Sequence, residues 1–285
     1  MKTWVTFLIV LLAAFAIFEL RAMRNSAPER IYRVSDGHVV SFGTMVADLK
    51  KEPIVFIGEF HTDVQHHQWE MDVIKALYDG GVPLTVGFEM FQAGYQTELN
   101  QWVDGKLSPA AFIQVYDKNW EMPWALYRDI FYYLRDNKIP AIALNLPWNI
   151  STKVAAFGFS SLSKAELSQL PPDITCSVDK RYMAFIKRAY AAHGVREKGF
   201  GYFCEAQVLW DKTMAWHTVK YLEKHPERTV VVLSGTGHAW KSGIPAQVEA
   251  LSGGTPYRVI LPEVPGEIDR EHITKSDADY ILLDN

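Results

Sequence analysis

Four short runs of consecutive apolar residues constrain the fold of this chain most strongly. The run Ile54-Val55-Phe56-Ile57-Gly58 is rich in β-branched residues and closed by glycine, which is typical of a strand buried on both faces. Segments with helical periodicity separate the runs. Because strands and helices alternate in this way in parallel sheets, we expect an α/β fold with a mostly parallel sheet flanked by helices. The other runs lie at 84–88, 141–144 and 229–234, and the helical segments at 64–78, 124–135, 182–193 and 203–222.

Further segments predict elements at the borders of this sheet. Residues 31–42 alternate around Asp36-Gly37, a dipeptide typical of hairpin turns, and predict two short antiparallel strands. A short helix is expected at 44–51. Residues 257–261 and 280–283 predict additional strands near an edge of the sheet.

The segment from about 91 to 135 is rich in aromatic residues and too long for a simple crossover. We interpret it as a helical excursion over the carboxyl end of the sheet. Aromatic side chains at helical spacing usually belong to the core, and we assign most of them to it. A few that face the end of the sheet would wall an apolar ligand pocket.

Composition and charge restrict the class of protein. With 48% hydrophobic and 22% charged residues, the chain is expected to be globular rather than disordered. The net charge of −4 and the absence of a Lys/Arg cluster give no footprint for nucleic acid, which we therefore exclude as a partner.

The N-terminus has the pattern of a targeting segment. Lys2 precedes an apolar run at 4–18, and Ala14-Phe15-Ala16 offers a small-residue cleavage site. The run is short for a span, which needs roughly 20 apolar residues. We therefore divide the chain into a signal peptide or N-terminal membrane anchor at 1–24, a linker at 25–30 and one domain at 31–285. This division predicts an exported protein that is periplasmic or anchored to the membrane.

Polar residues at the ends of the buried runs are the candidates for a functional site. In an open parallel sheet, ligands bind beyond the carboxyl ends of the strands. Two carboxylates and two imidazoles that converge there would either hold a divalent metal or form an acid/base set. Burying two carboxylates together costs free energy unless a cation or a shared proton offsets their repulsion. We therefore predict as catalytic or metal-ligating residues Glu59, His61, Glu89 and His238.

Other polar residues are expected to support this pocket. His66 and His67 point about 100° apart on their helix, and His66 shares the stripe that faces the sheet. Asn145 follows the third run. Gln207 and Asp211 lie four residues apart on a mostly buried helix, where polar side chains need partners. For each of these residues, a purely structural hydrogen bond is the alternative interpretation.

The chain resembles the ChaN-like family of haem-binding uptake proteins in several ordered motifs. The resemblance extends from about residue 53 to residue 262. A single motif would carry little weight, but several in order are fairly specific. The motifs are Ile57-Gly58-Glu59-Phe60-His61, His66-His67-Gln68, Phe88-Glu89-Met90-Phe91, Ala143-Leu144-Asn145-Leu146-Pro147, Ala206-Gln207 with Asp211 and Met214-Ala215, and Ser234-Gly235-Thr236-Gly237-His238.

The resemblance implies an exported haem- or iron-binding protein with an α/β fold. The family shares this fold with Tiki-type metalloproteases and erythromycin-esterase-like enzymes, and family haem binding is associated with Tyr and His ligands. Tyr182, Tyr190 and His193 are our candidates for the haem-iron side. We expect haem or another small-molecule ligand as partner, association with the membrane or the periplasm, and allow for a homodimer.

Two functions from different classes follow from these residues. A haem or iron carrier needs a large apolar slot and an axial ligand. A metal-dependent hydrolase of amide, ester or lactone bonds needs a compact polar pocket in which the four strand-end residues hold a divalent metal or activate water. Since the same fold occurs in proteins with unrelated functions, only the geometry and chemistry of the site distinguish these two functions.

Overall fold

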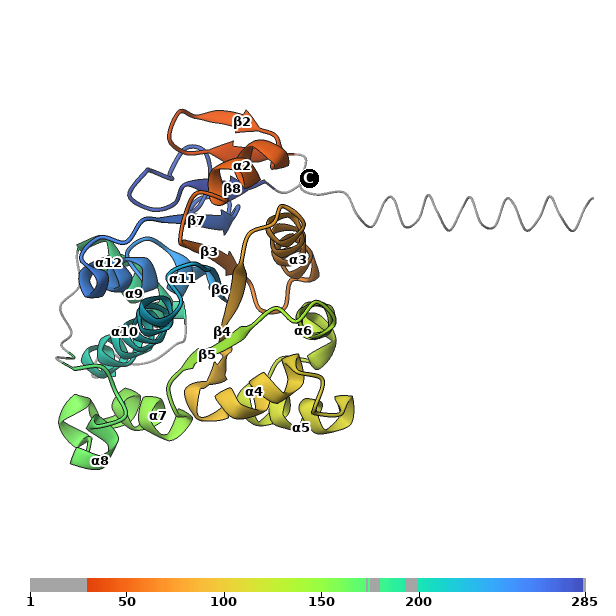
Figure 1. Ribbon diagram of the computed structural model, residues 1–285. Helices are drawn as coiled ribbons and strands as arrows, with labels where there is room; N and C mark the ends of the chain where they lie inside the picture. Colours follow the sequence, from red (N-terminus) through yellow and green to blue (C-terminus); the bar gives the residue numbers. More distant parts are fainter. Residues whose placement is uncertain (1–29, 173, 175–179, 193–198, 284–285) are drawn as a thin grey trace, which may run out of the picture.

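In this computed structural model, residues 30–172, 174, 180–192 and 199–283 are described. They form an eight-stranded sheet in the order β2-β1-β8-β7-β3-β6-β4-β5 (Figure 1). Strands β3 to β8 are parallel to one another, and β1 pairs antiparallel with both β2 and β8. The bounds are β1 Ile31–Arg33, β2 His38–Val40, β3 Ile54–Glu59, β4 Leu84–Gln92, β5 Ala141–Asn145, β6 Thr229–Gly235, β7 Tyr257–Pro262 and β8 Tyr280–Leu282.

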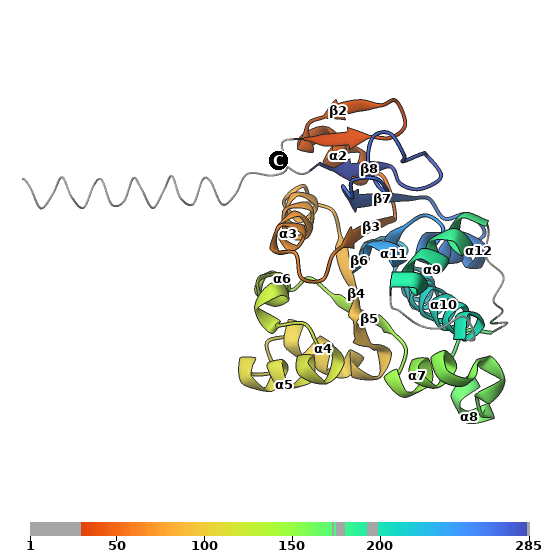
Figure 2. The ribbon, with the colours of Figure 1, turned by 180° about the vertical axis from the view of Figure 1, so that it is seen from behind.

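Helices cover both faces of this sheet. Figure 1 shows α3 and α6 on one side and α10 and α12 on the other, and the view from behind in Figure 2 shows the same division. This arrangement confirms the predicted α/β fold. The helices are α2 Phe42–Leu49, α3 Val64–Asp79, α4 Gln96–Val103, α5 Pro109–Asn119, α6 Trp124–Asp136, α7 Trp148–Phe157, α8 Lys164–Leu167, α9 Lys180–Ala192, α10 Phe200–Lys224, α11 Thr236–Ala239 and α12 Ile244–Ser252, with short 3-10 turns at Ala93–Tyr95 and Phe159–Ser161.

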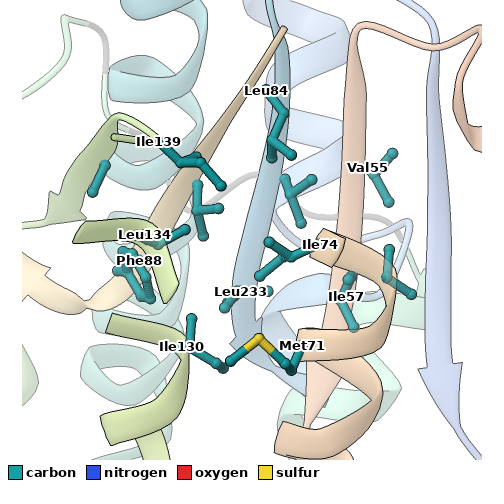
Figure 3. Packing of buried hydrophobic residues seen from close by; sticks show 14 of the residues in the cluster. Val55, Ile57, Met71, Ile74, Leu84, Phe88, Ile130, Leu134, Ile139 and Leu233 are labelled. Carbon is teal, nitrogen blue, oxygen red and sulfur yellow. The ribbon is translucent and has the colours of Figure 1, made fainter. Parts of the chain in front are cut away.

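The central strands place successive side chains in two separate cores. Val55 and Ile57 belong to the core under α3 and α6, whereas Ile54 and Phe56 belong to the core under α10 and α12. Figure 3 shows Val55 and Ile57 in the first core together with Ile74 of α3. A strand buried on both faces needs apolar residues at every position, which explains the uninterrupted run in the sequence.

The aromatic excursion forms the helices α4, α5 and α6, of which α4 packs against β5 and α5 against β4. Phe131 stacks on Phe88 with ring centroids 4.5 Å apart, so the excursion supplies a large part of the first core. It also reaches the carboxyl end of the sheet, where the Trp120 ring contacts the His61 ring edge-on at 4.9 Å. Most of the aromatic residues are therefore core, and Trp120 stands beside the predicted site.

The predicted localisation needs correction. None of the helices in the described part of the chain is long and apolar enough to cross a membrane, since a span needs roughly 20 apolar residues. The segment 1–24, on which export and anchoring were predicted, lies outside the described residues. The prediction of an exported, periplasmic or membrane-anchored protein is withdrawn.

Candidate functional site

Three neighbouring strands bring the predicted acidic residues to one end of the sheet. Glu59, the last residue of β3, pairs in register with Gly235, the last residue of β6. Glu89 comes from β4 on the other side of β6, and its Oε2 accepts a 2.7 Å hydrogen bond from the Gly235 backbone N–H. The two carboxylates thus flank the end of β6.

Glu59 holds the His61 ring in one orientation. Its Oε1 lies 2.8 Å from His61 Nδ1 and accepts a 2.6 Å hydrogen bond from the Tyr127 hydroxyl. Burial opposes the charge on Glu59, but the hydrogen bond from His61 and the adjacent imidazole of His67 lower the pKa of Glu59 to about 2. The hydrogen bond to Glu59 raises the pKa of His61 against the opposing effect of burial. The other ring nitrogen, Nε2, is left for the pocket.

His238 has the same arrangement with a second acid. Its Nδ1 lies 2.6 Å from Asp211 Oδ1, and the Tyr182 hydroxyl donates to the other oxygen of Asp211. Burial alone would lower the pKa of His238, but the charges of Glu89 and Asp211 raise it to about 9. Burial raises the pKa of Asp211 in turn. A buried carboxylate therefore fixes each imidazole from behind, as in carboxylate–histidine pairs that orient metal ligands and catalytic bases.

The two imidazoles and Glu89 meet above the end of β6. His238 Nε2 lies 3.7 Å from Glu89 Oε1. A Cβ atom at Gly235 would come within 3.2 Å of His61 Nε2 and 3.7 Å of Glu89 Oε2. Glycine at this position therefore keeps the floor of the pocket open. The structure brings the four strand-end residues together, and their catalytic or metal-binding role stays a prediction.

A cavity of about 360 Å³ opens over these groups, a size within the ordinary range for small-molecule sites. Its wall combines the polar strand ends with aromatic and aliphatic side chains. Phe60, at its rim, is 45% exposed, although large apolar side chains are usually buried. The cavity is lined by Glu59, Phe60, His61, Phe203, Gln207, Gly235, Thr236, Gly237, His238, Trp240, Val264, Glu267 and Ile268.

A second cavity, of about 870 Å³, lies next to α2 and the strands β1, β7 and β8. Its charged groups bind one another: Arg258 Nε donates to Asp48 at 2.9 Å, and the Tyr280 hydroxyl donates to the same carboxylate at 2.9 Å. This cavity is larger than the one above β6, so size alone would favour it as the candidate site. We place the candidate site in the smaller cavity because the pKa values of both its imidazoles, His61 and His238, are raised and the Nε2 atom of each lies on the cavity side.

The predicted supporting residues have different positions. Gln207 lines the cavity. Asn145 donates a 2.8 Å hydrogen bond to the Glu89 carbonyl and so fixes the β4 backbone. His66 Nδ1 accepts a 2.9 Å hydrogen bond from the Phe60 backbone N–H. Its effect on the site is indirect, through the loop that carries His61.

Tyr182 and Tyr190, two of the three predicted haem-iron ligands, are not among the residues that line the cavity. Tyr182 is buried and its hydroxyl donates to Asp211, so its oxygen is already engaged inside the protein. Tyr190 is buried with its ring packed against Phe200 and Phe203. His193 lies outside the described residues. Their role as iron ligands stays a prediction, and in the structure the Tyr182 hydroxyl contacts the carboxylate that holds His238.

Two residues that the sequence analysis did not select contact Glu59 from α3. His67 Nδ1 lies 2.8 Å from Glu59 Oε2 and 3.0 Å from Glu70 Oε2. Within the described ranges, Glu59, His67 and Glu70 are the group whose potential metal-ligating atoms all lie within 4.8 Å of one another. The predicted set of four does not form such a cluster. The spacing of His67 and Glu70, three residues apart on one helix face, was the available signal.

The fold and the pocket define an α/β protein with a small-molecule site at the carboxyl end of its parallel strands. The chain belongs to the family described as haem-binding uptake, Tiki superfamily, ChaN, whose model matches residues 45–248. This confirms the family resemblance.

Three known proteins are similar to this chain. ChaN of Campylobacter jejuni, solved with cofacial haem binding, has a TM-score of 0.71 and 20% identity and covers 88% of this chain and 95% of its own, which shows a shared fold. An erythromycin esterase in its open conformation has a TM-score of 0.49 and 12% identity, with 84% and 80% covered. Protein RETICULATA-RELATED 5, chloroplastic, of Arabidopsis thaliana is 29% identical over 228 residues, 74% of this chain and 31% of the relative, so the chain spans about a third of that relative's length.

Proposed function

We propose that this chain binds haem at the cavity above β6 and acts in haem or iron uptake, with His61 as the ligand to the iron. The observation that carries the proposal is the position of the His61 ring. Its side chain is 31% exposed, its Nδ1 is held by Glu59, and its Nε2 lies at the floor of the cavity beside Gly235. A carboxylate behind an imidazole increases the basicity of the other nitrogen as a ligand.

The residues around His61 support haem as the ligand. Haem would supply an iron that His61 would hold and an apolar ring for the surrounding side chains. Trp120 contacts the His61 ring, and Phe203 and Trp240 line the cavity. His238, whose pKa near 9 keeps it positively charged at neutral pH, offers a counter-charge for a carboxylate such as a haem propionate.

The role in uptake is supported by the description of the family as haem-binding uptake. The similar protein ChaN of Campylobacter jejuni binds haem cofacially. For this chain, we infer the same ligand class.

A hemin titration of the full chain tests this proposal. Wild-type protein should give a saturable Soret shift, and His61→Ala should weaken binding at least about tenfold, as expected when a metal ligand or its orienting partner is lost. His225→Ala is the matched control, because this side chain is 43% exposed at the end of α10. Equal hemin affinity of wild type and His61→Ala would contradict the assignment of the ligand.

The alternative function, hydrolysis with or without a divalent metal, is supported by a separate observation. Glu89 stands beside two imidazoles, each backed by its own buried carboxylate. Such a group can hold a water and move its proton. Hydrolysis of an activated ester such as p-nitrophenyl acetate, reduced at least about 100-fold in Glu89→Gln, would favour the enzyme. Equal ester turnover by the wild-type protein and by Glu89→Gln would exclude this role for Glu89.

A further inference from the structure

A buried cluster lies on the α3 side of Glu59, away from the cavity lining contributed by α10. We call Glu59, His67 and Glu70 the inner triad. All three side chains are buried, and His67 Nδ1 lies 2.8 Å from Glu59 Oε2 and 3.0 Å from Glu70 Oε2. Their three potential ligand atoms lie within 4.8 Å of one another. The haem proposal assigns no role to His67 or Glu70.

The ring of His67 directs Nδ1 into the inner triad. His67 Nε2 lies 3.2 Å from the His61 carbonyl oxygen, which only accepts hydrogen bonds, so Nε2 carries a proton. Nδ1 faces the two carboxylates and donates to Glu70, so a proton occupies the position between the acids. A metal cation that binds there takes the place of this proton on Nδ1.

Two carboxylate oxygens of the inner triad have unused capacity. Glu59 Oε2 and Glu70 Oε1 are buried and have no hydrogen-bond partner. His67 Nδ1 is close to Glu59 Oε2 but is aligned with Glu70 instead. In the described part of the chain, the ion pairs of both acids involve histidines and no Lys or Arg. Buried polar atoms are normally satisfied, so the unused oxygens call for a ligand.

Two carboxylates lie beside the same imidazole in the inner triad, and all three side chains are buried. Burying two carboxylates together costs free energy that a bound cation offsets. The surroundings hold the group rigid: the Tyr127 hydroxyl donates to Glu59 Oε1, and its ring packs on His67 at 4.3 Å. The inner triad is therefore oriented before any ligand arrives, as metal-ligand sets are.

We propose that the inner triad is a binding site for a divalent transition-metal cation, held by Glu59 Oε2, His67 Nδ1 and a Glu70 carboxylate oxygen. One imidazole with two carboxylates and no sulfur favours ions such as Mn²⁺, Fe²⁺ or Zn²⁺. The His61 carbonyl is the outer partner that fixes the His67 ring. This site shares Glu59 with the cavity, but His67 and Glu70 are not among the residues that line the cavity, and the site does not depend on haem binding.

Titration of the full chain with Co²⁺ alone, after treatment with a chelator, tests the site. Wild type should bind one Co²⁺ tightly, and Glu70→Gln should bind it at least about tenfold more weakly. Glu89→Gln is the matched control, because it makes the same change at a cavity residue and should keep Co²⁺. No stoichiometric binding, unchanged binding in Glu70→Gln, or loss in Glu89→Gln instead would each overturn the proposal.

A measurement on the wild type removes any dependence on folding of the variants. Pulsed electron paramagnetic resonance of bound Mn²⁺ should detect one imidazole nitrogen, from His67. Two imidazoles would indicate His61 and His238 and would overturn the proposal. His61→Ala retains the carbonyl that holds His67, so it should bind Co²⁺ while losing hemin. This variant separates failure of the metal site from failure of the haem site.

Discussion

The Nδ1 atom of His238 lies 2.6 Å from Oδ1 of Asp211, and this pair repeats across the cavity the arrangement of His61 with Glu59. The acids come from different elements, α10 and β3. In both pairs a buried carboxylate fixes Nδ1, so each Nε2 remains on the cavity side. The repetition makes the two imidazoles chemically alike although they come from opposite ends of the chain.

The Asp211 pair predicts a measurable pKa change. Asp211→Asn removes one of the two negative charges that offset burial, so the pKa of His238 should fall by at least about one unit from its value near 9. Titration of the His238 ring proton by NMR measures it. Tyr182→Phe keeps the Asp211 carboxylate and is the control, with a much smaller change. An unaltered pKa of His238 in Asp211→Asn would show that the Asp211 carboxylate does not stabilise the charged His238 ring.

Gly235 predicts a steric block of the cavity. Its backbone, at φ −54° and ψ 144°, is open to any residue, but a Cβ would lie 3.0 Å from His61 Cε1. Gly235→Ala should therefore weaken hemin binding at least about tenfold while lowering the free energy of unfolding by only about 1–3 kcal/mol. Hemin titration and denaturant unfolding measure the two effects.

The control for this variant is Gly201→Ala in α10, where a Cβ would meet nothing within 4 Å. Alanine in a helix is favoured over glycine by roughly 1 kcal/mol, so Gly201→Ala should keep hemin affinity and gain stability. If Gly235→Ala binds hemin as well as Gly201→Ala does, the ligand does not reach the end of β6.

Local sequence patterns were sufficient to predict the sheet. The run at 54–58 became β3, and the run at 229–234 became β6 beside it, because fully buried strands require uninterrupted apolar residues. The residues that follow these runs were expected at one end of the sheet for the same reason. Glu89 and His238 do lie 3.7 Å apart there, since parallel strands end on the same side.

Local sequence patterns do not predict the inner triad or the contact of Tyr182 with Asp211. Helical periodicity favoured His66 as the residue near the site, whereas in the first turn of α3 it is His67 that contacts Glu59. Which side of a first turn meets a strand end depends on the docking of the whole helix. The spacing of three residues joins His67 and Glu70 on one helix face, but it does not place them beside Glu59. The partner of Tyr182 comes from another helix.

The aromatic excursion predicts a large loss of stability from one core residue. Phe131 stacks on Phe88 at 4.5 Å and on Trp124 at 5.5 Å and is fully buried. Phe131→Ala should lower the free energy of unfolding by about 3–5 kcal/mol, measured by denaturant unfolding. Phe157→Ala, at a side chain 64% exposed in α7, should change it by less than about 0.5 kcal/mol. Similar losses in both variants would contradict this assignment of the core.

His217 predicts how stability changes with pH away from the site. Burial in α10 lowers its pKa to about 4, against roughly 6.5 in an unfolded chain. The folded protein therefore disfavours the charged ring. The stabilisation from neutral His217 is fully present above about pH 6.5 and is lost as the pH falls toward 4, on the order of 1–3 kcal/mol because the ring keeps partial solvent contact. The free energy of unfolding, measured from pH 7 to pH 4, should fall in wild type and in the control variant His225→Gln. It should change less with pH in His217→Gln. An equal pH dependence of all three proteins would mean that the His217 ring is hydrated in the folded state.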